Sequence, residues 1–300
     1  MKKTIALLVF TAITFTGFSQ EDEDQQKSNI QTYTPSKLLK KGQWDIKWFN
    51  NLYTETKDLF GNQEGTQKRD IPRNSFFTSS VDIFTGVSDS NTFNVGLLFE
   101  IRSNAIGGRK ALDVFSFDGE RGTARSGFTS FAPAVKFNPI KSVGNFTIQT
   151  AFHIPLVDNE SEEGVFLDQD GFIFQNRFFY DHSFAGGDWQ IFTELNTEYN
   201  FGEKASFAYN SLRLTPGAFL SYFPSSKFTV LGLVQHIQLI SFGGNDLGEN
   251  DFNQNATILG GGAKYQLTNE LNIEFLYSNF FRGKATGLGQ TFNIGLRALF

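Results

Sequence analysis

Apolar and polar positions alternate with a period of two residues in stretches that recur along most of the chain. In the clearest stretch, Phe93, Val95, Leu97, Phe99 and Ile101 alternate with a mostly polar set of residues. Successive side chains of a strand point to opposite faces, so this alternation predicts strands with one apolar and one polar face. We expect strands at 43–55, 75–87, 92–103, 126–138, 144–157, 171–182, 188–201, 210–223, 227–242, 255–267, 270–282 and 288–300.

The predicted links between these strands alternate in length. Long polar links at 56–74, 104–125, 158–170, 202–209 and 243–254 alternate with short ones at 88–91, 139–143, 183–187, 224–226 and 268–269. Outer-membrane barrels have long loops outside and tight turns on the periplasmic side. The final link, 283–287, is short where this rule requires a long one, and in 227–242 either face could be the apolar one.

This pattern predicts an all-β fold, an antiparallel transmembrane β-barrel of about twelve strands. The barrel is expected to span residues 43–300 with both termini in the periplasm, because an even number of strands returns the chain to the side where it entered. A secreted, soluble β-sandwich is the structural alternative. The two differ in the fate of the apolar faces, which a sandwich buries and a barrel turns toward lipid.

Residues 1–19 have the anatomy of a signal peptide. Lys2 and Lys3 precede an apolar run at 5–15, and small residues follow before position 20. The run is shorter than the roughly 20 residues of a membrane-spanning helix. We therefore expect export and removal of this segment.

Residues 20–42 are polar and charged, and they separate the signal peptide from the first predicted strand. Thr34 and Pro35 fit the start of a short helix, and Gly42 fits its end. We expect a periplasmic N-terminal lead-in, and a plug inside the lumen is the alternative.

The last predicted strand resembles the C-terminal recognition strand of bacterial outer-membrane β-barrel proteins, an alternating segment that ends in Phe. The apolar face of this strand carries Phe292, Ile294, Leu296 and Phe300. The resemblance implies that these residues form an assembly signal read by the barrel-assembly machinery, and that the protein resides in the outer membrane in contact with its lipid. In general layout the chain also resembles the transporter-like barrels grouped with meta-pathway phenol degradation, which implies that small solutes are its cargo.

Composition supports the same class of protein. The chain has 36 Phe, 8 Tyr and 3 Trp, and such side chains are concentrated at the two membrane interfaces of a barrel. It has no cysteine, so neither disulfides nor thiol chemistry are available. Its net charge is −5 and no basic run follows the signal, which argues against a nucleic-acid partner.

Residues suited to catalysis are few. His182 and Ser183 are adjacent and superficially similar to the catalytic pair of a lipid hydrolase, but neighbours on a strand face opposite ways. Acidic clusters in 158–170 and 243–254 lack the spacing of a calcium loop. We therefore predict no enzyme, no catalytic residue, no cofactor and no metal. A lipid-modifying enzyme that uses His153, His182 or His236, and a structural or adhesive barrel with a closed lumen, remain the alternatives.

If the apolar face of each strand points outward, charged side chains of both signs point into the lumen. They could form a polar path for small solutes, or they could pair across a narrow bore and close it. We predict a solute path. Its candidate lining residues are Lys47, Glu100, Arg102, Lys136, Arg177, Asp181, Glu194, Glu198, Arg213, Lys264, Glu274, Arg282 and Arg297.

Overall fold

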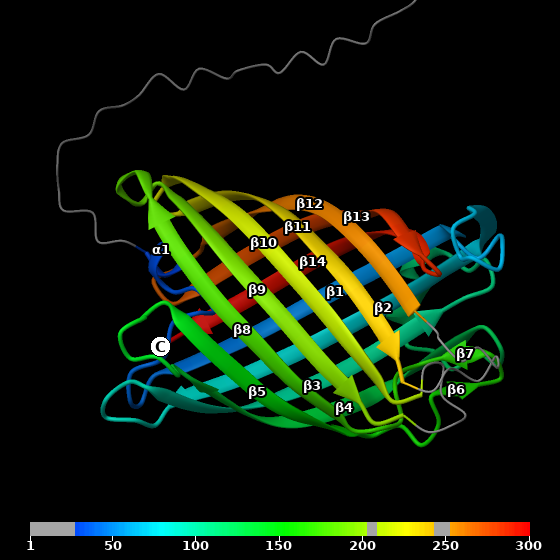
Figure 1. Cartoon of the computed structure of the whole chain (residues 1–300), viewed down its shortest axis with the longest axis horizontal. Helices are drawn as coiled ribbons and strands as arrows, with labels where there is room; N and C mark the ends of the chain where they lie inside the picture. The colour runs from blue at the N-terminus through cyan, green and yellow to red at the C-terminus, as the bar shows by residue number, and fades with distance from the viewer. Residues whose placement is uncertain (1–27, 203–208, 243–252) are drawn as a thin grey trace, which may run out of the picture.

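A computed structural model describes residues 28–202, 209–242 and 253–300 and shows a closed barrel (Figure 1). Twelve antiparallel strands form its wall. They are β1 (Trp44–Asp58), β2 (Arg69–Gly86), β3 (Phe93–Ala105), β4 (Ala124–Phe137), β5 (Phe146–Pro155), β8 (Ile173–Phe184), β9 (Trp189–Asn200), β10 (Ser211–Ser225), β11 (Phe228–Ser241), β12 (Asn253–Gln266), β13 (Leu271–Lys284) and β14 (Gly287–Leu299).

The barrel closes between its first and last strands. In the pairing of β1 with β14, Lys47 lies opposite Arg297 and Asn51 opposite Asn293. The predicted barrel fold is thereby confirmed, and each predicted strand is present. The largest difference between a predicted and an observed strand boundary is at the start of β2. This strand begins at Arg69 because the β1–β2 hairpin continues into the residues predicted to be a loop. There Arg69 donates two hydrogen bonds to the Asp58 carboxylate, at 2.8 and 3.0 Å.

The two ends of the barrel differ (Figure 1). One end, here called the turn end, holds the links at 87–92, 138–145, 185–188, 226–227 and 267–270, together with the short helix α1 (Asn29–Thr32) and the C-terminus. The 185–188 link contains the 3₁₀ turn η2 (Ala185–Gly187).

The opposite end, here called the loop end, holds the links at 59–68, 106–123, 156–172 and 285–286. The 106–123 link contains the 3₁₀ helix η1 (Ala111–Ser116), and the 156–172 link contains the small hairpin of β6 (Ser161–Glu162) and β7 (Val165–Phe166). The predicted links 202–209 and 243–254 lie largely outside the described residues.

The outer face of the strands is apolar and exposed. Leu97 is 44% exposed, Phe275 49% and Ile294 48%, although each sits in the middle of a strand. A soluble sandwich would bury such side chains, whereas a membrane barrel turns them toward lipid. In the described part of the chain, no helix is both long enough and apolar enough to span a membrane.

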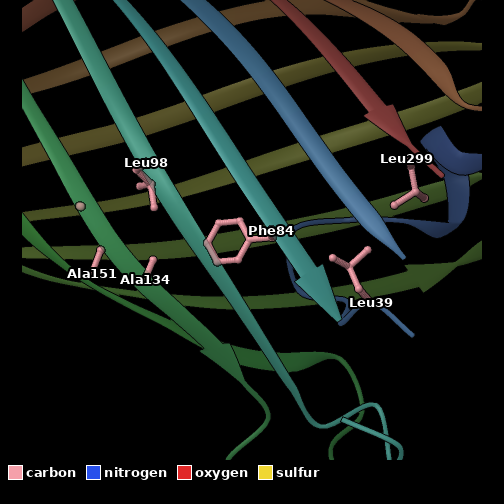
Figure 2. Packing of buried hydrophobic residues seen from close by; sticks show 7 residues of the cluster. Leu39, Phe84, Leu98, Ala134, Ala151 and Leu299 are labelled. Atoms are coloured by element: carbon pink, nitrogen blue, oxygen red, sulfur yellow. The ribbon is translucent and has the colours of Figure 1, made fainter. Parts of the chain in front are cut away.

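Part of the interior is filled by a hydrophobic cluster (Figure 2). Phe84 of β2 and Leu98 of β3 point inward and pack with Leu39 from the segment before β1. Small side chains on β4 and β5, such as Ala134 and Ala151, leave room for them. Phe84 therefore packs inside the barrel rather than at the membrane interface, because it falls on the inward face of β2.

Candidate functional site: the barrel lumen

The lumen contains a cavity of about 570 Å³. Its walls come from β1, β2 and the consecutive strands β8 to β14, and its floor comes from the segment that precedes β1. The hydrophobic cluster occupies the interior beside β3, β4 and β5, so the cavity runs along the other side of the barrel.

Ion pairs between neighbouring strands lie on the cavity wall. Arg177 of β8 donates a hydrogen bond from Nε to Glu194 Oε1 of β9 at 2.7 Å, and its guanidinium lies 5.0 Å from the centroid of the Phe179 ring. Lys264 of β12 pairs with Glu274 of β13. These cross-strand pairs hold charge of both signs at the surface of the cavity.

A second charged group joins the first and last strands of the barrel, β1 and β14. The Arg297 guanidinium donates to both carboxylate oxygens of Asp45, at 2.8 and 2.9 Å, across 252 positions of sequence. Lys47 Nζ lies 3.6 Å from the same carboxylate. Asp45 is 3% exposed, and two cations satisfy its charge.

The cavity wall also carries a set of large apolar side chains. Phe192, Phe219, Leu231, Leu233 and Phe280 line it from strands β9, β10, β11 and β13. In β11 the inward Leu231, Leu233 and Ile237 lie on one face and a second apolar face points outward, so an outward-pointing apolar face does not by itself decide the direction of this strand. The cavity is amphipathic, with ion pairs on one part of its surface and aromatic and aliphatic side chains on another.

Residues 28–42, here called the N-terminal strap, cross the opening at the turn end. Asn29 Nδ2 donates to the Asn269 carbonyl at 2.6 Å beside β12, and the Leu39 amide donates to Asn94 Oδ1 of β3 at 2.9 Å. Asn94 Nδ2 donates in return to the Leu39 carbonyl at 3.2 Å. The strap thus spans the mouth from one side of the barrel to the other.

Asp181 of β8 holds the middle of the strap. Its Oδ1 accepts hydrogen bonds from Thr34 Oγ1, at 3.0 Å, and from Ser36 Oγ. Lys37 Nζ lies 3.6 Å from the same oxygen, and Gln190 Nε2 donates to Oδ2 at 3.3 Å. Asp181 is 4% exposed and Ser36 is fully buried, so these bonds are formed away from solvent.

Tyr33 connects the strap to the charged wall. Arg297 Nη1 donates to the Tyr33 carbonyl at 2.6 Å, and the guanidinium lies 4.5 Å from the Tyr33 ring centroid. Burial raises the pKa of the Tyr33 phenol, so the ring stays neutral and presents its π face to the cation.

Residues 156–172, here called the lumen loop, narrow the opening at the loop end. Asp168 Oδ1 lies 2.9 Å from Arg102 Nη1, and Arg102 also pairs with Glu100 at 2.6 Å. Asn104 Nδ2 donates to the Phe166 carbonyl at 2.6 Å. Arg102 and Asn104 point into the barrel from β3, so the loop enters the lumen, and its Leu167 is 3% exposed.

Three further predicted lumen residues, Glu198, Arg213 and Lys136, lie outside the charged groups described above. Glu198 accepts a hydrogen bond from Arg213 at 3.4 Å near the loop end. Lys136 is 4% exposed, with its Nζ 5.5 Å from the Phe179 ring centroid.

Arg282 is the exception among the predicted lumen residues, because it is exposed on the outside of the barrel. The register of β12 and β13 shifts between Thr257, opposite Arg282, and Ile258, opposite Phe280. Ile258 lines the cavity, so Thr257 and its partner Arg282 face outward. The bulge interrupts the alternation from which the inward direction of Arg282 is predicted.

The predicted assembly residues lie at the seam. Phe292, Ile294 and Phe300 are 45%, 48% and 59% exposed on the outer face, and Leu296 is half-buried. Phe300 exchanges two backbone hydrogen bonds with Trp44, at 2.7 and 3.0 Å, and so extends the β1–β14 pairing. Their role in assembly stays a prediction.

The three histidines lie apart. His153 Nε2 is 3.4 Å from Gln175 Oε1 inside the barrel, and His236 Nδ1 is 3.0 Å from Thr257 Oγ1 on its outer face. His182 is exposed. Within the described residues, no group of three or more acidic or histidine side chains is placed to hold a metal ion.

The sequence prediction misses several acidic residues of the lumen, among them Asp45, Asp82 and Asp168. Asp45 and Asp82 lie two residues from Lys47 and Phe84 on the inward faces of β1 and β2, so strict alternation would have found them. Asp168 comes from a loop and carries no such signal.

The closed barrel with a lipid-facing surface is the fold of an outer-membrane β-barrel protein. No family model matches the sequence, and no curated protein matches it significantly.

Among solved structures, the chain is similar to the COG4313 outer membrane channel from Pseudomonas putida F1, with a TM-score of 0.65 and 9% identity over 89% of this chain and 98% of that one. It is also similar to the β domain of the Bordetella autotransporter BrkA, with a TM-score of 0.54 and 12% identity over 85% and 99% of the two chains. At these identities the likeness concerns the fold.

Proposed function

We propose that this protein is an outer-membrane channel for small solutes that carry both an apolar part and a charged or polar group. The observation that carries the proposal is the amphipathic cavity of about 570 Å³ inside a closed barrel. Cavities of roughly 300–1,000 Å³ suit small-molecule ligands. The apolar wall would take the hydrocarbon part of a solute, and the Arg177–Glu194 and Lys264–Glu274 pairs would take its polar group.

The proposed path is a controlled one rather than a wide aqueous pore. The strap crosses one mouth and the lumen loop narrows the other, so a solute passes only when these segments move. The short links at the turn end support placing that end in the periplasm, with the signal peptide at 1–19 and the strap within the predicted lead-in at 20–42.

Reconstitution tests this proposal. We expect the purified protein to give discrete conductance steps in planar bilayers and to admit small amphipathic solutes into liposomes. Arg177→Ser removes a cation from the cavity wall and leaves Glu194 behind, so the reversal potential in a salt gradient should move toward cation preference.

Arg282→Ser is the matched control for Arg177→Ser. It removes the same charge from the outer face and should leave selectivity unchanged. Equal shifts in the two variants would contradict the assignment of the path to this cavity.

A closed, structural barrel is the second candidate, and the segments at both mouths favour it. It predicts folded protein with neither conductance nor uptake, even after the strap has been released. A lack of transport in both the native chain and a strap-released variant would therefore replace the channel proposal with this one.

A further inference from the structure

The outer wall of β2, β3 and β4 is poor in large apolar side chains near the loop end. The strand register aligns Ser75, Ala105 and Ala124 in one outward row, and Phe77, Ser103 and Ser126 in the row below it. Elsewhere the outer face of the barrel carries exposed Leu, Ile and aromatic residues. Without a covering segment, β2, β3 and β4 would present small and hydroxyl-bearing side chains to lipid near the loop end.

The 106–123 link folds back along this outer wall and covers it. Ser103 Oγ donates to the Val114 carbonyl of η1 at 2.6 Å, and Ser126 Oγ donates to the Phe117 carbonyl at 3.0 Å. Phe77, Ala105 and Val114 form a buried cluster beneath η1, at 6%, 1% and 1% exposure. The hydroxyl groups of Ser103 and Ser126 therefore have hydrogen-bond partners within the protein and are not left unpaired against lipid.

The outer surface of the link supplies the apolar side chains that the strands lack. Leu112, Phe115 and Phe117 are 66%, 49% and 48% exposed. The rings of Phe115 and Phe117 pack edge-on against Phe77, with centroids 4.9 and 6.1 Å away. The exposed side chains of the link adjoin Phe128 of β4, which is 62% exposed and lies two residues after Ser126, the partner of the Phe117 carbonyl.

The level of η1 matches the outer boundary of the membrane. Phe93 stands at the turn-end rim of β3, and Ser103 lies ten residues further along the same strand. At about 3.3 Å per residue and a tilt of about 40°, this separation corresponds to roughly 25 Å of height, the thickness of the apolar band of such barrels. Aromatic side chains are concentrated at this level.

The acidic residues of the link gather around one arginine. Arg109 lies 2.8 Å from Asp118, 3.0 Å from Glu120 and 3.5 Å from Asp113. The link is therefore amphipathic, and its acidic side chains are paired with Arg109 of the same link.

We infer that the segment 109–118 is a lipid-facing anchor, which inserts Leu112, Phe115 and Phe117 among the acyl chains of the outer leaflet just below the head groups. The occupant is lipid because the patch is continuous with the lipid-facing wall and lies at the height of its aromatic belt. A second copy of the chain on the same patch is the competing occupant.

Single-cysteine labelling tests the anchor directly, because the native chain has no cysteine. Leu112→Cys and Phe115→Cys, labelled with an environment-sensitive dye, are reconstituted in vesicles that contain lipids spin-labelled near the head group or deep in the chain. Leu97→Cys is the lipid-exposed control. Glu120→Cys, on the charged side of the same link, is the matched aqueous control.

We expect labels at 112 and 115 to show blue-shifted emission and to be quenched most by the shallow spin label, while the label at 120 resembles free dye. Labels at 112 and 115 that behave like the one at 120 would overturn the inference. A blue shift without lipid quenching, which disappears on dilution of protein in lipid, would overturn it in favour of contact between copies. Heat-dependent gel mobility of each variant establishes that the barrel is folded.

Discussion

Release of the N-terminal strap can be tested by removing two hydroxyl groups. Thr34→Val combined with Ser36→Ala deletes both hydrogen bonds that the strap donates to Asp181 Oδ1 and leaves the barrel strands untouched. In the docked state Asp181 then lacks two hydrogen-bond donors, whereas in the released state water molecules can donate to its carboxylate. The change therefore destabilises the docked state specifically.

The magnitude follows from the burial of this contact. A hydrogen bond to a charged group contributes about 1.5–3 kcal/mol, and two bonds to one oxygen are not additive, so we take about 3 kcal/mol for the pair. Each 1.4 kcal/mol is a factor of ten in population, so the released state should rise roughly a hundredfold.

Two measurements report on the released state. Trypsin cleavage after Lys37, located by mass spectrometry, should accelerate in proportion to the released population, because Lys37 pairs with Asp181 while docked. The frequency of channel opening in planar bilayers should rise in parallel. Lys41→Ala is the control, since it removes only an exposed ion pair between the strap and Asp89, which contributes little.

The reasoning would be refuted by a folded double variant in which cleavage after Lys37 is as slow as in the native chain. Rapid cleavage without any change in opening would retain the docking contact but separate it from transport. If both chains open at the same frequency, the lumen loop is the segment that controls passage; if neither opens, the closed, structural barrel replaces the channel.

Three further predictions concern the barrel wall and its loops. Leu97→Arg on the lipid face should lower the free energy of unfolding from bilayers by about 2–4 kcal/mol if the site lies near the midplane, as measured by urea titration in vesicles, whereas Arg102→Ser in the lumen should leave assembly intact. Phe300→Ala should slow assembly by the outer-membrane machinery in cells, measured as the rate at which heat-modifiable protein appears; an unchanged rate would contradict the signal role of this residue. Hydrogen bonds from Arg109 and Ser116 lower the pKa of Asp118 to about 2. The hydrogen bonds that the Asp118 carboxylate accepts should therefore contribute fully to the order of the loop above about pH 4, and this contribution should be lost as the pH falls toward 2. A dye at position 115 whose emission does not change between pH 4 and 2 would contradict that coupling.

The sequence by itself determined the wall of this protein. Alternation such as that from Phe93 to Ile101 is a local property of the backbone, because each residue of a strand reverses the direction of the next side chain. Strand number, link positions and the outward face of most strands follow from that rule alone. Most of the predicted charged residues point inward for the same reason.

Tertiary structure decided what fills and covers that wall. The strap reaches Asp181, and the lumen loop reaches Arg102, through segments without periodicity, so no local pattern marks their destinations. Both faces of β11 are apolar, and only its pairing with β10 and β12 determines which of them lines the cavity. Arg282 faces outward because a register shift between β12 and β13 resets the alternation. The outer position of η1 follows from its packing on Phe77, a contact between residues that approach each other only when β2 and β3 pair.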